Sequence, residues 1–300
     1  MSSRIPVHSV SPEGPSAQAV PSSHVADHPD RLERKIGKAM TELNVRLGLF
    51  GEGDRVMVGI SGGKDSYTLL HMLMRAQRIA PFHFEILAFH LDQGHPSFPV
   101  HRIREHLETL DVPWAIERED TYNIVTEKVP VGQTPCSLCS RLRRGILYDA
   151  ARRHGCNKVA LGHHREDLIE TLLLNLFYAG MMATMPPKLL NDAGDVIVIR
   201  PLAEVSEATI IEFSNAMAFP IVPCTLCGRG RDLKRDRVGR LVHELEKEIP
   251  GLSASLMNAM ANIRPSHLLD EKLFDHHAIG SAHAEAAPRS IPDGHGWEDE

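Results

Sequence analysis

Hydrophobic and polar positions follow two alternating patterns from residue 55 onwards. Short apolar runs of strand length occupy residues 55–60, 84–92, 113–119, 157–164 and 195–202. Segments with helical spacing of apolar residues follow these runs, at 64–78, 99–110, after the loop at 130–135 through residue 153, at 167–178 and at 206–217; two more helices end near residue 263. Strands that alternate with helices predict an α/β fold, with a parallel sheet sandwiched by helices. Ligands of such sheets bind beyond the carboxyl ends of the strands.

The two ends of the chain lack this periodicity. Residues 1–30 are rich in Ser and Pro and are predicted to be disordered, and residues 277–300 are predicted to form an acidic, flexible tail. These tails hold the excess of acidic side chains behind the net charge of −6. One domain is therefore predicted over residues 31–276.

Membrane and secretion signals are missing from the pattern. The chain has no apolar run near the ~20 residues that a membrane span requires. Its first thirty residues have no apolar core of the kind found in secretory signals. We therefore expect a cytoplasmic protein with no membrane partner.

The loop S-G-G-K-D-S at residues 61–66 joins the first strand to a helix. Its glycines let backbone N–H groups approach an anion, and the helix that begins at Lys64 adds unpaired donors and a positive dipole end. Ser61 and Ser66 can donate hydroxyl hydrogen bonds. The Walker pattern G-x-x-x-x-G-K-[ST] is not met, because Val58 and Asp65 stand at its required positions. A phosphate-binding loop of another class is predicted, and a plain turn with a capping serine is the alternative.

A second set of polar residues follows the strand at 157–164. Gly162, His163 and His164 end this strand, and Asp167 and Glu170 follow on one face of a helix. A carboxylate pair beside a phosphate loop can hold Mg²⁺. The alternative is that the two acids only favour a helix N-terminus through its dipole.

Four of the five cysteines form two C-x-x-C pairs, Cys136 with Cys139 and Cys224 with Cys227. Each pair can present two thiolates to one metal ion. The gap between the pairs is far longer than in a compact zinc ribbon, so only the tertiary fold can unite them. Structural zinc, an iron–sulfur cluster and a redox dithiol all remain possible from the spacing.

Basic residues flank both cysteine pairs. They can contact a phosphate backbone, although for any single patch a solvated helix face is the favoured interpretation. The residues are Arg141, Arg143, Arg144, Arg229, Arg231, Lys234 and Arg235.

The S-G-G-x-D-S pattern resembles the PP-loop signature of the adenine nucleotide α-hydrolase-like ATP pyrophosphatases. The resemblance implies that residues 61–66, with Gly62 and Gly63 at the turn, hold ATP and that Lys64 and Asp65 are catalytic. The G-H-x-x-x-D element of that superfamily corresponds to Gly162, His163 and Asp167, and implies nucleotide contacts there and Mg²⁺ at Asp167. Adenine in these enzymes lies near the end of the second strand, here at His90 and Asp92.

A narrower resemblance covers residues 31–276. The runs "CSLCSRLRRGILY", "MPPKLL", "IRPL", "PCTLCG", "RPSHLLD" and "LFD" are similar to those of the tRNA 2-thiocytidine synthetases. That family implies a [4Fe–4S] cluster on three cysteines: Cys136, Cys139 and, in preference to Cys224, Cys227. A buried structural thiol is expected at Cys156.

The same resemblance implies the reaction. ATP would adenylate the C2 oxygen of cytidine 32 in the tRNA anticodon loop, and sulfide on the open iron, supplied by a cysteine desulfurase, would displace AMP. A homodimer is also implied. The rival hypotheses are a lysidine-synthetase-like adenylating enzyme, which needs no cysteine pairs, and a zinc-stabilised RNA-binding protein without catalysis.

Overall fold

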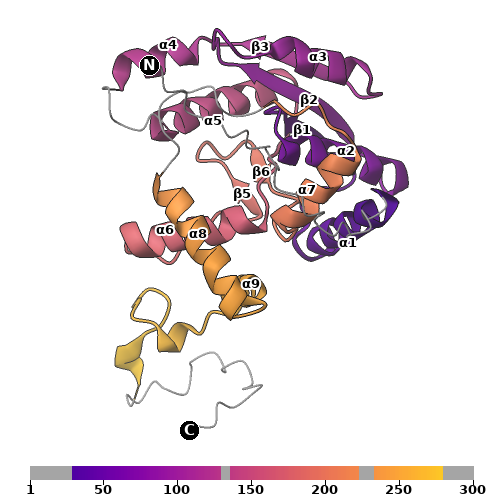
Figure 1. The fold of residues 1–300 in the computed structure, drawn as a ribbon. Coiled ribbons are helices and arrows are strands. Elements are labelled where there is room, and N and C mark those ends of the chain that lie inside the picture. Colours follow the sequence, from indigo (N-terminus) through magenta and orange to yellow (C-terminus); the bar gives the residue numbers. More distant parts are fainter. Residues whose placement is uncertain (1–28, 130–135, 223–232, 280–300) are drawn as a thin grey trace, which may run out of the picture.

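The computed structural model describes residues 29–129, 136–222 and 233–279 of the chain. Within these residues one sheet has the strand order β3-β2-β1-β4-β6-β5 (Figure 1). Its strands are β1 (Arg55–Gly59), β2 (Glu85–Asp92), β3 (Trp114–Arg118), β4 (Lys158–Ala160), β5 (Lys188–Leu190) and β6 (Ile197–Ile199). All neighbours pair in parallel except β5, which is antiparallel to β6. The predicted α/β fold is confirmed.

Strand β1 lies where the order of the sheet reverses. The chain places β2 and β3 on one side of β1 and then returns to place β4 on the other, so that Val56 pairs with both Ile86 and Lys158. A reversal of this kind opens a crevice at the carboxyl ends of the two central strands. The loops after β1 and β4 therefore face each other.

Helices cover both faces of the sheet (Figure 1). One face carries α1 (Pro29–Leu47), α2 (Lys64–Ile79), α3 (Val100–Glu108) and α7 (Glu207–Ala216), and the other carries α5 (Cys136–Arg153). The alternation of β1 shows this directly, because Val56 and Val58 pack with the first group and Met57 packs against α5. All three side chains are fully buried, as expected for a central parallel strand.

A third apolar cluster lies beside the sheet. It joins α6 (Arg165–Tyr178) to α8 (Leu233–Glu248) and α9 (Leu252–Ala261) through Ile169, Val238 and Val242 (Figure 1). Short 3₁₀ turns at Pro265–His267 and His276–Ala278 follow. Among the described helices, none combines the length and the apolar character needed to cross a membrane.

Three elements were not predicted from the sequence: α1, α4 (Thr121–Lys128) and β5. Helix α1 begins two residues inside the predicted N-terminal tail and buries Leu32, Ile36, Met40 and Leu43 on one stripe. Helix α4 is short and begins where the Asp120 side chain accepts a hydrogen bond from the Asn123 N–H (3.4 Å). Its 8 residues are too few for a helical period to be distinguished from a loop.

Two predicted strands are shorter than the apolar runs that suggested them. The run at 157–164 contributes only β4, and the run at 195–202 contributes only β6. After β6, the Ala203 N–H bonds to the Arg200 carbonyl oxygen (3.1 Å) and turns the chain away. The second run stays apolar past the end of β6 because Pro201, Leu202 and Ala203 of the following turn are buried as well.

Candidate active site

The loop at 61–66 stands at the switch point between β1 and α2. Gly62 has φ of +86°, and a Cβ there would lie 3.1 Å from Ile103 Cδ1 and 3.2 Å from Val222 Cβ. Gly63 has an ordinary φ of −88°. Gly62 is therefore required both by its positive φ and by the lack of room for a Cβ, whereas the backbone conformation of Gly63 is open to other residues.

Hydrogen bonds within the loop set its shape. Ser66 is buried; its hydroxyl donates to the Gly63 carbonyl oxygen (2.9 Å) and accepts from the Ser61 N–H (3.2 Å). Ser66 therefore supports the loop from inside, and Ser61 is the exposed hydroxyl. No side chain caps the N-terminus of α2. Its first N–H groups are available to an anion, as the sequence predicted.

Lys64 stands over this helix end between two carboxylates. Its Nζ lies 3.0 Å from Asp65 Oδ1 and 2.9 Å from Glu207 Oε1, at the first residue of α7. Burial would lower the pKa of Lys64, but the two carboxylates outweigh it and raise the pKa. The lysine is therefore held charged at the loop.

The turn after β4 touches the phosphate loop. A Cβ on Gly162 would lie 2.9 Å from the Asp65 carbonyl carbon, so only glycine allows this approach. His164 then caps α6: its N–H donates to Asp167 Oδ2 (3.0 Å) in a capping box. The structure brings the two predicted motifs into direct contact.

His164 is buried among acidic groups. Its Nδ1 lies 3.2 Å from Glu166 Oε2, and its Nε2 lies 3.5 Å from Asp167 and 3.8 Å from Asp65. Burial opposes its charge, but these carboxylates prevail and raise the pKa of His164. A second positive charge is therefore favoured beside Lys64, at a residue that the sequence analysis quoted without giving it a role.

His163 has the opposite character. Burial, and secondarily the positive charge of Arg200, lowers the pKa of His163 to about 4. Its Nδ1 is buried without a hydrogen-bond partner in the described part of the chain. This histidine is a neutral group with an unused ring nitrogen, a property that suits a predicted ligand contact.

Asp167 has partners on both oxygens. Oδ2 accepts from His164, and Oδ1 lies 3.4 Å from Nη1 of Arg235, which also contacts Glu170 Oε2 at 3.1 Å. Across the described ranges no three His, Cys, Asp or Glu side chains form a group that could hold a metal ion. Two carboxylates, of Asp65 and Asp167, nevertheless converge on His164 at the loop. Oxygen donors of this type suit Mg²⁺ when phosphate supplies further ligands.

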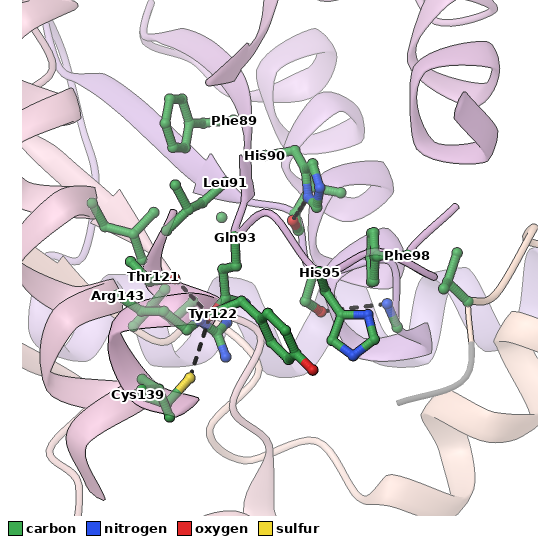
Figure 2. Close-up of a pocket in the computed structure, with 18 of the residues that line it drawn as sticks. Phe89, His90, Leu91, Gln93, His95, Phe98, Thr121, Tyr122, Cys139 and Arg143 are labelled. Carbon is green, nitrogen blue, oxygen red and sulfur yellow. Dashed lines mark hydrogen bonds between the residues drawn. The ribbon is translucent and has the colours of Figure 1, made fainter. Parts of the chain in front are cut away.

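A pocket of about 260 Å³ opens beside the phosphate loop (Figure 2). It extends from Ser61 and Gly63 along the end of β2 to Cys139 and Arg143 on α5. Its wall contains apolar side chains from β2, α4 and α5, among them Phe89, Leu91, Val125 and Leu147. A single cavity thus joins the phosphate loop to the first cysteine pair.

The two residues predicted near adenine differ in position. His90 lines the pocket, stacks on Phe98 (ring centroids 5.4 Å apart) and donates Nδ1–H to the Ile60 carbonyl oxygen at 2.8 Å. Burial lowers the pKa of His90, so its Nε2, which has no partner among the described groups, is an acceptor. Asp92 instead accepts from the Gly94 N–H (2.9 Å) and shapes the turn after β2.

The first cysteine pair lies at the start of α5. Cys136 is its first residue, and Cys139, one turn later, faces the pocket with Sγ 3.3 Å from Gln93 Oε1 (Figure 2). Cys224 and Cys227 lie outside the described residues, but Val222 lines the same pocket and donates its N–H to the Gly62 carbonyl oxygen (2.9 Å). Cys156 is buried in the core, as expected, and burial raises the pKa of its thiol.

The predicted basic residues fall into two groups. Arg141, Arg143 and Arg144 are exposed on α5. Arg235 is instead an internal partner of Asp167 and Glu170, and Lys234 lies over the Tyr178 ring (4.6 Å). Arg229 and Arg231 lie outside the described residues. Of the predicted set, the three α5 arginines therefore lie together on one exposed stretch of helix.

Sequence reasoning missed two residues that the fold brings to this site. Glu207 reaches Lys64 from a helix more than a hundred positions away, and no local pattern marks it. Gln93 follows β2 at the sheet edge where ligands were expected, and that position was the only available signal.

Comparisons with known proteins agree with this geometry. The family model described as PP-loop domain matches residues 30–220. A tRNA-cytidine(32) 2-sulfurtransferase of Anaeromyxobacter dehalogenans is 51% identical over 243 residues, which cover 81% of this chain and 84% of that protein. The enzyme of the same name from Aeromonas hydrophila is 49% identical over 249 residues, covering 83% and 81%.

A solved structure shares the fold. The U34-tRNA thiolase NcsA from Methanococcus maripaludis, with its [4Fe-4S] cluster, superposes with a TM-score of 0.63 at 19% identity. The alignment covers 79% of this chain and 81% of NcsA.

Proposed function

This chain belongs to the PP-loop family of tRNA-cytidine(32) 2-sulfurtransferases, and we propose that it thiolates cytidine 32 of tRNA to 2-thiocytidine at the expense of ATP. The resemblance drawn from its PP-loop and cysteine motifs is thereby confirmed. The observation that carries the proposal is the single pocket that extends from the phosphate loop to Cys139. An adenylating site and a sulfur-handling site would need to share such a space.

The loop at 61–66 would bind the phosphates of ATP. N–H groups at the uncapped start of α2 and the ammonium of Lys64 would stabilise the negative charge that grows on pyrophosphate. The apolar pocket wall, with the neutral His90 as acceptor, would take the adenosine. The cytidine C2 oxygen would attack the α-phosphorus, release pyrophosphate and leave C2 bonded to AMP as leaving group.

The carboxylates of Asp65 and Asp167 suit a Mg²⁺ ion bound together with ATP. The ion would neutralise phosphate charge. Its proposed protein ligand is Asp167, as the sequence analysis expected.

Cys136, Cys139 and one cysteine of the second pair would hold a [4Fe–4S] cluster, with Cys227 preferred to Cys224. Soft thiolate donors fit an iron–sulfur cluster, and Val222, two residues before Cys224, already borders the pocket of Cys139. When bound, the cluster would supply a nucleophilic sulfur near the activated base. The sulfur would attack C2, and the C2–O bond would break to release AMP.

The tRNA would lie across α5, where Arg141, Arg143 and Arg144 are exposed. Unstacking the base costs little in a single-stranded loop. A cysteine desulfurase is the proposed source of sulfur, with a thiol as the two-electron reductant that converts its persulfide sulfur to sulfide. We place the reaction in the cytoplasm in a homodimer.

Two variants separate the half-reactions. In anaerobically purified protein we expect about four irons and four sulfides per chain, 2-thiocytidine in digested tRNA, and AMP in equal amount. Cys139→Ala would lose iron and 2-thiocytidine but keep tRNA-dependent release of pyrophosphate, whereas Lys64→Ala would keep iron and lose pyrophosphate release. The control Cys156→Ser would keep both. Tightly bound zinc without iron after anaerobic reconstitution would overturn the proposed cluster. Cluster-loaded protein that releases pyrophosphate but forms no 2-thiocytidine would overturn the proposed reaction.

A further inference from the structure

Gln93 is a residue of the pocket whose side chain contacts a cysteine. Cys139 Sγ donates to Gln93 Oε1 across 3.3 Å, and the two residues come from different elements, the turn after β2 and the start of α5 (Figure 2). Nothing in the nucleotide-binding motifs uses this glutamine. The contact places an amide directly beside a sulfur to which the proposed function gives a metal.

The amide is held in position from two sides. The Tyr122 N–H donates to the Gln93 carbonyl oxygen (3.0 Å), which fixes the backbone, and the hydroxyl of the buried Thr121 lies 3.4 Å from Gln93 Oε1. The turn itself is tight: Gly94 has φ of +75°, and a Cβ there would lie 3.1 Å from Asp120 Oδ1. These contacts therefore direct the Gln93 side chain toward Cys139.

A thiol and a thiolate need opposite partners at this place. The thiol of Cys139 has a proton to donate and suits the amide oxygen, whereas a thiolate has none and is disfavoured by that oxygen. Rotation of the amide by half a turn brings Nε2–H to the same position with almost no change of shape. The Thr121 hydroxyl can either donate or accept, so it supports both orientations.

Resting on the proposed function, we propose that Gln93 is a positioning residue for the cluster: its amide turns over and donates Nε2–H to the metal-bound sulfur of Cys139. Hydrogen bonds to ligand sulfurs withdraw electron density, raise the reduction potential and retain the metal. Gln93 thereby acts through Cys139 and touches no reacting atom.

Two isosteric substitutions test the donor role. Gln93→Met keeps the volume without a hydrogen bond, and Gln93→Glu keeps an acceptor but places a negative charge against the sulfur. In full-length, cluster-loaded protein we expect a more negative midpoint potential and faster iron loss to a chelator, on the order of 10-fold for Met and more for Glu. Thr121→Val, which loosens the amide, should fall between wild type and Gln93→Met.

Thr126→Val is the matched control. Thr126 lines the same pocket, but its hydroxyl donates to the Tyr122 carbonyl oxygen (2.8 Å). The midpoint potential and the rate of iron loss of this variant should therefore equal those of wild type. Urea unfolding of each metal-free variant separates misfolding from the loss of the hydrogen bond.

The outcomes distinguish this inference from the proposed function. If wild type binds iron and Gln93→Glu retains it as well as wild type does, Gln93 serves only as an acceptor and the inference falls alone. An unchanged potential in Gln93→Met, with a raised KM for ATP, would make Gln93 a nucleotide ligand instead. Wild-type protein that takes up no iron would overturn the cluster and the inference together.

Discussion

The two ends of the central strands treat their polar side chains in opposite ways. At the amino end, Asp54 accepts hydrogen bonds from the Gly51 N–H (2.7 Å), Lys158 Nζ (2.6 Å) and Asn157 Nδ2 (2.8 Å). Lys158 also donates to the Leu49 carbonyl oxygen (2.8 Å). A largely buried ion pair is therefore held by several further hydrogen bonds.

At the carboxyl end some polar groups of the described chain are left without partners. Nδ1 of His163 and Nε2 of His90 are buried without hydrogen-bond partners in the described residues, and the start of α2 has no side-chain cap. Each unsatisfied group costs about 1–3 kcal/mol. The paired groups at the amino end therefore stabilise the fold. The unpartnered groups at the carboxyl end lower its stability and remain free to bind a ligand.

Removing the lysine of the phosphate loop should give the largest effect. For Lys64→Met we expect kcat/KM for ATP-dependent thiolation to fall on the order of 10²–10³-fold, because a preorganised donor to the leaving group is lost. The free energy of unfolding should change little, since the side chain is partly exposed. Steady-state kinetics measure kcat/KM, and urea titration measures the free energy of unfolding. A large loss of stability together with the loss of kcat/KM would contradict the difference between the two ends.

Asp54→Ala should show the reverse pattern at the amino end. The substitution leaves the ammonium of Lys158 buried without its carboxylate, and we expect a loss of roughly 3 kcal/mol in unfolding free energy. kcat/KM measured well below the unfolding midpoint should stay within about twofold of wild type. Asp54→Asn, which keeps two of the acceptor contacts, is the milder companion; a large fall in kcat/KM would contradict the assignment.

The two ends should also titrate in different pH ranges. The folded pKa of His163 is about 4, below its ordinary value of about 6.5, so the unfolded chain binds more protons and stability falls as pH drops through this range, by at most about 3 kcal/mol. For Asp54, burial alone would raise the pKa, but the hydrogen bonds from Lys158 and Asn157 lower it. Its contribution is present above its ordinary pKa of about 3.9 and is lost only as pH falls further.

Unfolding free energies from pH 7 to 3 check this separation. His163→Gln should flatten the slope between about 6.5 and 4 and leave the more acidic part intact. An unchanged slope in that variant would show that another group titrates there.

The smallest effect concerns the two glycines of the loop. Gly62→Ala should cost about 1–2 kcal/mol from its positive φ alone, with more from the contact to Val222, whereas Gly63→Ala should cost less than about 1 kcal/mol. Thermal unfolding of the pair measures the difference. Equal costs would mean that the loop relaxes and that Gly62 is not required by shape.

Local sequence patterns determined the alternating α/β architecture and the phosphate loop. Both depend on short-range chemistry: the period of apolar residues, and glycines between a strand and a helix. The turn between β1 and α2 was predicted correctly because the Ser61–Ser66 and Ser66–Gly63 hydrogen bonds that shape it join neighbours in the chain. Helix α1 had a comparable signal in Leu32, Ile36 and Met40, and it was overlooked beside the Pro- and Ser-rich tail.

Only the tertiary structure decided which polar groups share the site. Glu207 contacts Lys64, and Gln93 contacts Cys139, because the sheet brings distant segments to one edge. Two adjacent histidines also differ through their neighbours: nearby carboxylates raise the pKa of His164 against the effect of burial, whereas burial, followed by the charge of Arg200, lowers the pKa of His163. Sequence sets which groups a chain can offer, and packing sets their charge and partners, because both depend on neighbours that are remote in sequence.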